Sequence, residues 1–382
     1  MKRVRRAWRK PRGTEQASGA GPSAPAGGAP ASTALSPTLA TLLGLAASVV
    51  VLAGLSLGRE IVGPVALAAV IVIICHPVRG PLLRRGWPSW LATTAVIAVA
   101  YVVLAIMAAM LVYAGSAFVG LVRDFADELS QTADNVVAWL EGLGLADQAS
   151  DAVASLLDPA TLVRYGTSLG GTAISALTAF FFVLAYVIFM AADAARYARA
   201  GDTFGPAIRP TVRRFADYNR SVRRYYVVNA AFGLVVAIVD GLALWLLAIP
   251  IPIVWAILAF VTNFIPNIGF VIGLIPPALL ALVVGGWPLM LIVIAIYCVV
   301  NVTLQVMVQP KFVSDAVDLS LTLSFFSVIF WTFVIGPLGA ILSIPLTLLV
   351  RALVLEPDPR SWWLRWLSGD QRAAPPGARS AS

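Results

Sequence analysis

Residues 253–284 read IVWAILAFVTNFIPNIGFVIGLIPPALLALVV, and residues 319–350 read LSLTLSFFSVIFWTFVIGPLGAILSIPLTLLV. Both runs are almost wholly apolar, and each is interrupted once, by Pro-Asn-Ile-Gly at 266–269 and by Gly-Pro-Leu-Gly at 336–339. The limbs beside each break are shorter than the ~20 residues with which a helix crosses a bilayer. We therefore predict two re-entrant helical hairpins, which enter the membrane without crossing it.

A full-length apolar segment precedes each predicted hairpin, at 226–248 and at 287–308. The order helix, hairpin, helix, hairpin makes two equivalent units, and the second is inverted relative to the first. Many secondary transporters contain inverted repeats of this kind, with the substrate site where broken helices meet near the middle of the membrane. The alternative is that glycine and proline only kink ordinary membrane-spanning helices.

The composition of the whole chain indicates an integral membrane protein. Of its 382 residues, 59% are hydrophobic and only 12% are charged, whereas a soluble domain carries about 25% charged residues to solvate its surface. The apolar segments lack the period-two alternation of a membrane barrel, so the predicted class is all-α integral membrane. We expect about six full transmembrane helices plus the two hairpins, which hydropathy would count as eight spans.

The loop charges predict the orientation of these spans. The remaining spans are expected at 39–57, 61–75, 89–115 and 170–192, and arginines follow the second and the fourth of them. Residues 116–168, by contrast, hold eight acidic residues and two arginines. The positive-inside bias then places both termini in the cytoplasm, and it assigns the +8 net charge to the membrane and its lipids rather than to nucleic acid.

The predicted organisation follows from these segments. Residues 116–168 show apolar positions at helical spacing, so they are expected to form an amphipathic segment that packs on neighbouring helices or on another subunit, or a solvated cap. The parts are a basic and low-complexity cytoplasmic tail (1–38), N-terminal transmembrane helices (39–115), the extracytoplasmic segment (116–168), the fourth span with a basic cytoplasmic loop (169–224), a transport domain with the broken hairpins (225–355) and a cytoplasmic tail (356–382).

Three motifs stand in order in the C-terminal half. They are Asn-Phe-Ile-Pro-Asn-Ile-Gly at 263–269, continuing to Ile-Pro-Pro at 275–277; Gln-Pro-Lys at 309–311; and Gly-Pro-Leu-Gly-Ala-Ile-Leu-Ser-Ile-Pro-Leu at 336–346. This ordered set resembles that of the autoinducer-2 exporter family of bacterial membrane proteins. The layout is also similar from about residue 39 to 355. One departure is Ser-Asp at 314–315, where the family usually has a glycine shortly after the Pro-Lys pair.

The resemblance implies a function in the bacterial cytoplasmic membrane. It implies export of a small polar signalling molecule, autoinducer-2 or a related solute, although other members of the family are linked to sodium/proton exchange. A homo-oligomer, in particular a pentamer, and an elevator-like movement of the hairpin domain are also implied by the resemblance.

Polar residues inside the apolar runs are the candidate binding site, because an unsatisfied polar group in lipid costs several kcal/mol. A helix break frees backbone groups, and carboxamide side chains both donate and accept hydrogen bonds. Contacts between helices are the alternative role for these residues. The candidates are Thr262, Asn263, Asn267, Asn301 and Gln305, with Gly269 and Gly339 allowing close approach, and the expected hinge or break positions are Pro266, Pro276, Gly336, Pro337 and Pro345.

Asp240 is a separate candidate, because it is a carboxylate within the apolar run 226–248. At that depth it could take up H+ or Na+ and so couple solute movement to an ion gradient. The alternative is that Asp240 lies near the outer interface, where water reaches it.

The sequence predicts no enzyme activity, cofactor or metal site. Gly-Thr-Ser-Leu-Gly at 166–170 matches a serine-nucleophile pattern, but that motif requires a histidine base. The only histidine, His76, is predicted on the opposite side of the membrane from Ser168. We therefore predict a secondary transporter that exports or exchanges a small polar solute. A sodium/proton antiporter and a non-transporting scaffold that presents the arginine loop 196–224 to partners are the alternatives.

Overall fold

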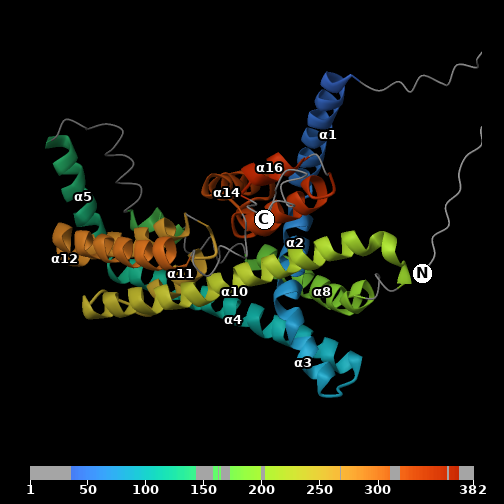
Figure 1. Cartoon of the computed structure of the whole chain (residues 1–382). Helices are drawn as coiled ribbons and strands as arrows, with labels where there is room; N and C mark the ends of the chain where they lie inside the picture. The colour runs from blue at the N-terminus through green and yellow to red at the C-terminus, as the bar shows by residue number, and fades with distance from the viewer. Residues whose placement is uncertain are drawn as a thin grey trace, which may run out of the picture. The chain divides into compact units, whose positions relative to one another are not determined.

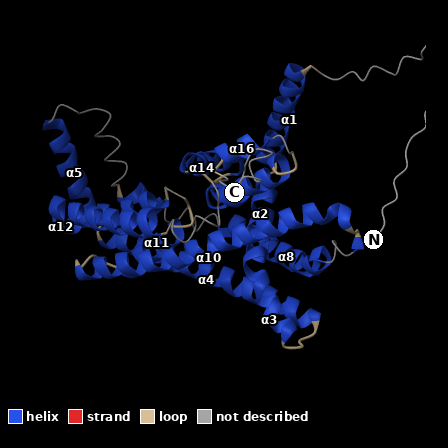
Figure 2. Ribbon diagram, viewed as in Figure 1, coloured by secondary structure: helices blue, strands red, loops and turns tan. Residues whose placement is uncertain are grey.

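The computed structural model describes residues 36–142, 158–161, 163–164, 173–198, 203–266, 268–309, 319–358 and 361–369. In these ranges the chain is helical, with turns between the helices and without a strand (Figure 2). The predicted tail up to residue 35, the 166–170 pattern, Asn267 and the Pro-Lys pair at 310–311 lie outside them. The chain divides into two compact units, residues 1–50 and 51–382, and the second contains the elements discussed below.

Figure 1 labels the helices of the described residues. In chain order they are α1 (Pro37–Leu57), α2 (Arg59–Cys75), η1 (His76–Val78), α3 (Arg79–Arg84), α4 (Ser89–Asp124), α5 (Ala126–Gly142), α8 (Ala173–Ala198), η2 (Pro206–Ile208), α10 (Arg209–Leu246), α11 (Pro252–Thr262), α12 (Gly269–Asn301), η3 (Val302–Val308), α14 (Leu321–Ile335), α15 (Pro337–Val350), η4 (Arg351–Leu355) and α16 (Trp362–Leu367).

Five helical segments of the described chain are long and apolar enough to cross a membrane. They are Arg59–Arg84, Ser89–Asp124, Pro206–Leu246, Gly269–Gln305 and Pro337–Leu355. The predicted all-α, multi-pass class is therefore confirmed. One of the five is in fact two helices, because Gly286 has φ 69° and ψ −167°, which no helix contains. The second helix begins at this turn, where the sequence predicted the start of 287–308.

Both predicted breaks interrupt helices. The first lies between α11 and α12, at residues 263–268. The second is Gly336, which separates α14 from α15 with φ 76° and ψ −160°. Only glycine adopts that backbone region readily. We call α11 with residues 269–285 of α12 hairpin one, α14 with α15 hairpin two, and residues 287–308 the bridging helix.

The prolines of the second limbs do not interrupt them. α12 continues through Pro276 and α15 through Pro345, although both were predicted as hinge or break positions. An internal proline removes one backbone hydrogen bond and bends a helix, but neighbouring groups in a membrane protein can compensate for the loss.

Two helices, α10 and α4, extend furthest beyond their predicted bounds. α10 begins at Arg209, seventeen residues before the expected start at 226, so much of the predicted arginine loop is helical. This stretch is polar, so hydropathy does not mark it as part of a membrane helix. Its helical structure is nevertheless consistent with Pro210, since proline is favoured in the first turn of a helix, and with its arginines, which have a high helix propensity. α4 extends past 115 to Asp124, and its last turns bury Leu121 and Val122.

α10 packs against both hairpins, at different parts of its length. Its first half, with Val222, Tyr225 and Tyr226, shares a hydrophobic core with α2 and hairpin two. Its end, at Leu244, shares a second core with α4, hairpin one and the bridging helix. A third core joins α2, α4 and α8.

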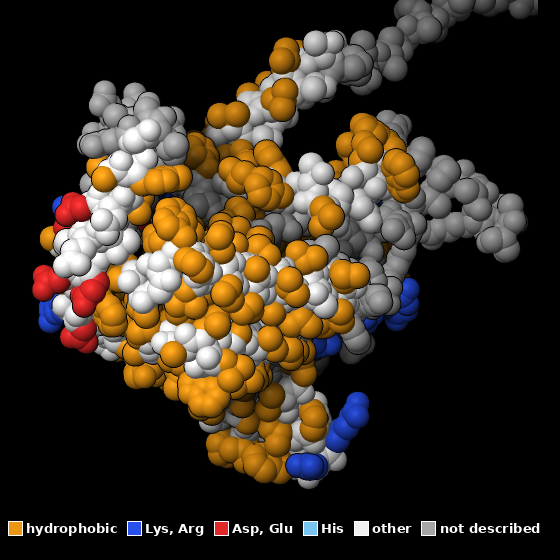
Figure 3. Space-filling view, turned by 90° about the vertical axis from the view of Figure 1, so that its left-hand side faces the viewer, with side chains coloured by type: hydrophobic (Ala, Val, Ile, Leu, Met, Phe, Trp, Pro, Cys, Tyr) orange, Lys and Arg blue, Asp and Glu red, His pale blue; other side chains and the backbone are white. Residues whose placement is uncertain are grey.

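The outer surface of the second unit is largely apolar. Large side chains such as Val112 on α4, Phe189 on α8 and Phe333 on α14 are well exposed. Figure 3 shows hydrophobic side chains across one face, with the acidic side chains confined to one margin. A soluble monomer rarely exposes so much contiguous apolar surface, whereas a bilayer would cover it.

Candidate functional site

Asn263 lies at the centre of a buried polar cluster at the break of hairpin one. It caps the C-terminus of α11, and its side chain is buried. Its Nδ2 donates to the backbone oxygen of Asn229 in α10 at 2.8 Å, and its Oδ1 accepts from Gln305 Nε2 at 2.9 Å. The side chain thus ties the break to α10 and to the bridging helix.

The bridging helix contributes Asn301 and Gln305. Gln305 Nε2 also donates to Asn301 Oδ1 at 2.5 Å, and Asn301 Nδ2 donates to the backbone oxygen of Tyr297 at 2.8 Å. Gln305 lies in η3, a π-helix that follows α12 directly. Single π-turns inside α-helices occur often at functional sites, where they turn side chains out of the regular helical register.

Two further members were not predicted. Gln309 Nε2 donates to Asn229 Oδ1 at 2.6 Å. Asn229, Gly233 and Asp240 all lie on the buried face of α10, and their spacing of four and seven residues could have placed Asn229 on the same face of that helix as Asp240. Gln309 was noted only as part of a motif. We call Asn229, Asn263, Asn301, Gln305 and Gln309 the carboxamide cluster.

Asp240 lies in the same region of α10, fully enclosed by protein. Its side chain is 0% exposed, and neither carboxylate oxygen has a hydrogen-bond partner among the described residues. With Asn263, Tyr297, Asn301 and Gln305 it lines a small cavity. This burial argues against the alternative in which Asp240 is solvated at the outer interface. An ionised carboxylate without a partner is costly in such a place, so a proton or a cation that neutralises it would be stabilised.

Glycines let the polar groups and the hairpin limbs come close together. A Cβ at Gly233 would lie 2.5 Å from Asn263 Nδ2, so only glycine leaves room for that amide. A Cβ at Gly269 would overlap the carbonyl oxygen of Thr262, and one at Gly339 that of Trp331. Gly269 and Gly339 therefore occupy equivalent places, each just after a break and against the backbone of the preceding limb.

The other predicted residues do not join the hydrogen bonds of the cluster. Thr262 is buried, but its hydroxyl donates to the carbonyl oxygen of Leu258 within its own helix, at 2.9 Å. Gly339 and the break at 336–337 belong to hairpin two, whereas the donors and acceptors of the cluster come from α10, α11 and the bridging helix. Pro266 lies in the turn beside Asn263.

Tyr226 connects the two hairpins. Its hydroxyl donates to the backbone oxygen of Ile341 in hairpin two at 2.9 Å. Its ring stacks on Phe264 in the break of hairpin one, with the ring centroids 6.2 Å apart. Because Tyr226 and Asn229 lie one turn apart on α10, the break of hairpin one and the second limb of hairpin two contact the same part of that helix.

Comparison with known proteins identifies the family. The sequence profile described as "AI-2E family transporter" matches residues 45–356. The AI-2 transport protein TqsA of Escherichia coli is 30% identical over 309 residues, which cover 79% of this chain and 88% of TqsA. A Haemophilus influenzae protein named "Putative transport protein" is 27% identical over 340 residues, covering 86% of this chain and 96% of that protein. With its several apolar helices, the chain is a multi-pass inner-membrane transporter and belongs to the AI-2E transporter family.

Proposed function

We propose that the protein is a secondary transporter that moves a small polar solute through the carboxamide cluster. The observation that carries this proposal is a connected set of five carboxamides at the break of hairpin one, within a largely apolar protein. Asn229, Asn263 and Asn301 are buried, and Gln305 and Gln309 are half-buried. Carboxamides offer both donors and acceptors, so together they can replace the water that hydroxyl and carbonyl groups of a solute give up on leaving solution.

In the conformation described, carboxamides of the cluster hydrogen-bond to one another. Gln305 Nε2 is shared between Asn263 Oδ1 and Asn301 Oδ1. A solute that donates to these two oxygens and accepts from Gln305 Nε2 could therefore enter without leaving these groups unpaired. The alternative is that the carboxamides only hold the helices together, at about 0.6 to 2 kcal/mol for each contact. Gln305 reaches the cluster from the bridging helix, and Gln309 follows the last residue of that helix. Movement of the bridging helix would therefore open the cluster.

The lengths of the limbs support re-entrant hairpins. At 1.5 Å per residue, the first limbs α11 and α14 measure about 16 and 22 Å, below the ~30 Å of the hydrocarbon core. The second limb of hairpin two is longer, because α15 continues into η4 up to Leu355. In addition, Ser320 N donates to Ser368 O at 2.9 Å. The chain before α14 and the chain after α15 therefore lie together, as expected if hairpin two returns to the side from which it enters.

Cysteine labelling tests this placement. Pro266→Cys and Gly336→Cys are introduced singly into a background with Cys75→Ala and Cys298→Ala, because those two cysteines are free. With an impermeant maleimide applied from either side of the membrane, we expect both positions to react poorly unless transport opens a path. Full reaction of the two positions from opposite aqueous faces would show complete spans instead.

The transport proposal is tested with full-length protein in liposomes under imposed proton or sodium gradients. Because one relative is named an AI-2 transport protein, autoinducer-2 is the first solute to examine, followed by a panel of small hydroxylated solutes. We expect gradient-driven flux of at least one of them, and its loss in Asn263→Leu. Flux that persists unchanged in Asn263→Leu would assign the route to another part of the protein.

A second candidate function is sodium/proton exchange, which the unpartnered carboxylate of Asp240 favours. Proton release on binding of sodium is expected if one carboxylate alternates between the two ions. The test follows internal pH with a dye in liposomes that receive a sodium pulse. Exchange should disappear in Asp240→Asn and persist in Asn263→Leu, whereas unchanged exchange in Asp240→Asn would refute this function.

A further inference from the structure

A short segment follows the last membrane helix and lies beyond the residues that match the family. Residues 361–369 contain α16, with the sequence Trp-Trp-Leu-Arg-Trp-Leu at 362–367. The family match ends at residue 356, and the last apolar span ends at Leu355. The segment therefore begins only about six residues beyond the end of that span.

The segment has two different faces. Ser361 and Ser368 are buried, seven residues apart, and Arg365 between them is half-buried. Trp363, Trp366 and Leu367, at i, i+3 and i+4, are 50%, 61% and 58% exposed. Side chains at this spacing share one side of a helix, so two indole rings and a leucine point away from the protein while the serine face packs on it.

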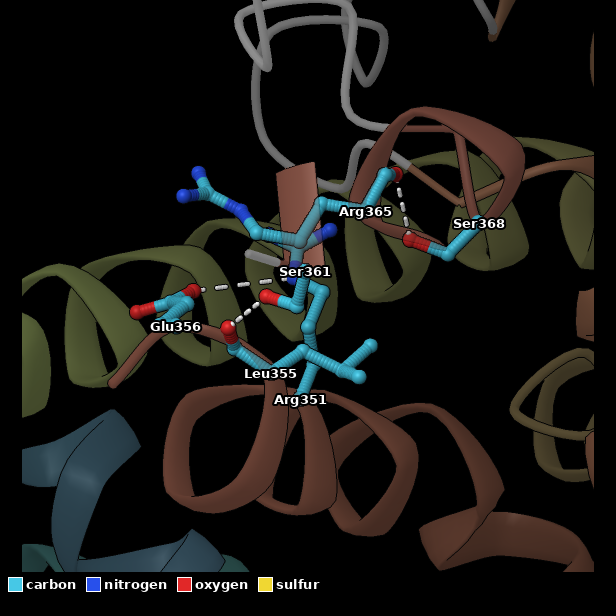
Figure 4. A network of polar contacts seen from close by, with 6 residues as sticks. All are labelled: Arg351, Leu355, Glu356, Ser361, Arg365 and Ser368. Carbon is cyan, nitrogen blue, oxygen red and sulfur yellow. Dashed lines mark hydrogen bonds and ion pairs between the residues drawn. The ribbon is translucent and has the colours of Figure 1, made fainter. Parts of the chain in front are cut away.

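Hydrogen bonds on the buried face attach the segment to both ends of hairpin two. Ser361 Oγ donates to the backbone oxygen of Leu355 (Figure 4), and also to that of Asp358. The adjoining end of hairpin two carries an ion pair between Arg351 and Glu356, with Nε 3.6 Å from Oε1 (Figure 4). At the other end, Ser368 O accepts from the backbone amide of Ser320, the residue that caps α14. The segment thus bridges the end of η4 and the start of α14.

We propose that residues 361–369 are a membrane-interface anchor for hairpin two, bound to the headgroup region of the bilayer through Trp363, Trp366 and Leu367. Tryptophan is favoured at this depth because its ring is apolar and its N–H is polar. The distance in sequence from the last span keeps the segment at the membrane surface. The anchor holds the start of α14 at that surface through the Ser320–Ser368 bond.

The first experiment places the outward face relative to the lipid. Trp366→Cys, in the background without Cys75 and Cys298, is labelled with an environment-sensitive fluorophore, and the full-length protein is reconstituted into liposomes with 30% anionic lipid. Quenchers attached to the lipid near the headgroup are compared with quenchers deep in the acyl chain and with aqueous iodide. The matched control is Arg365→Cys, one residue away and half-buried.

We expect label 366 to be quenched several-fold more strongly by the shallow lipid quencher than by iodide or the deep quencher, and more strongly than label 365. Strong quenching by iodide alone would make the segment a solvated tail. Protection from all three quenchers would mean that protein, such as a second copy of this chain, covers the face. Either result would overturn the proposal.

The second experiment tests whether the anchor acts on hairpin two. In the triple variant Trp363→Ser, Trp366→Ser, Leu367→Ser, hydrogen exchange of the Ser320 amide should become several-fold faster in liposomes, because local opening becomes easier. Trp90→Ser, at an exposed tryptophan at the start of α4, is the control and should leave that exchange unchanged. An unchanged rate in the triple variant would show that the segment does not hold the start of α14.

Discussion

At the scale of single residues, we expect substitution of Asn263 to disturb the carboxamide cluster most, because its side chain bonds to both Asn229 and Gln305. Asn263→Leu keeps the number of side-chain heavy atoms and the branched shape but removes a donor to Asn229 and an acceptor for Gln305. Leaving buried partners unpaired costs about 1–3 kcal/mol, so we expect a lower thermal unfolding temperature together with loss of solute flux. Thr303→Val, at an exposed position of η3, the π-helix that contains Gln305, should change neither the unfolding temperature nor the flux. A fully active Asn263→Leu variant would contradict this prediction.

A substitution at Gly233 can distinguish a steric effect on the carboxamide cluster from a general loss of stability. In Gly233→Ala the new Cβ would lie 2.5 Å from Asn263 Nδ2, so the amide must move away from the Asn229 carbonyl. Alanine favours a helix over glycine by about 1 kcal/mol, which offsets part of the cost. We expect flux to fall at least tenfold while the unfolding temperature changes little. Gly120→Ala, where the new Cβ meets open space, serves as the control.

Asp240 should behave as a functional rather than a stabilising residue. Both of its oxygens are buried and have no hydrogen-bond partner in the part of the chain that the structure describes, so Asp240→Asn removes a charge that none of these residues compensates. We expect the variant to unfold at the same or a higher temperature than the wild type in the absence of sodium, and to lose any stabilisation by added sodium. A marked fall in its unfolding temperature would reveal a structural role for the carboxylate.

At the scale of helices, the two hairpins should respond alike to the same substitution. A Cβ at Gly269 or Gly339 would overlap a backbone carbonyl of the preceding limb, and backbone atoms cannot move aside as a flexible side chain can. Overpacking of this kind costs typically 1–3 kcal/mol. We expect both Gly269→Ala and Gly339→Ala to lower the unfolding temperature and abolish flux, whereas Gly54→Ala, in open space, should have no effect. A large difference between the two hairpin variants would argue against their equivalence.

The features that could be predicted from the sequence are those determined by residues close together in the chain. Glycine and proline mark the breaks at 263–268 and at Gly336 because their backbone limits act within a few residues. The first half of α10 could not be recognised by hydropathy, since it is polar and rich in arginine. Pro276 and Pro345 were interpreted too strongly, because the sequence does not tell a bent helix from a broken one. Asn267, also predicted for the site, lies outside the described residues.

The same distinction applies to the site. Asn263, Asn301 and Gln305 could be selected as polar residues beside a break, and their side chains do meet. Asn229 and Gln309, by contrast, hydrogen-bond to each other although they lie 80 residues apart in the sequence. Such a contact depends on how α10 packs against the bridging helix, which no local pattern encodes. The fully enclosed position of Asp240 likewise follows from packing rather than from the apolar run around it.

At the scale of the molecule, the charge distribution should fix one orientation in the membrane. The basic helix α3 and the arginine-rich start of α10 lie toward one side of Figure 1, and α5 with its acidic residues lies toward the other. Positively charged segments remain in the cytoplasm. We therefore expect Arg85→Cys, in the exposed turn after α3, to react with an impermeant maleimide only after the membrane is opened, and Ser130→Cys, exposed on α5, to react in intact cells.

Both variants are made without Cys75 and Cys298, so that each labelling signal comes from a single site. The opposite pattern would invert the protein and place the start and end of hairpin two outside the cell. Labelling of both positions in intact cells would require a different number of crossings between them. Since α4 is the membrane helix that connects these two positions, and at 36 residues it spans about 54 Å, it is long enough to cross the hydrocarbon core of ~30 Å and carry α5 beyond it.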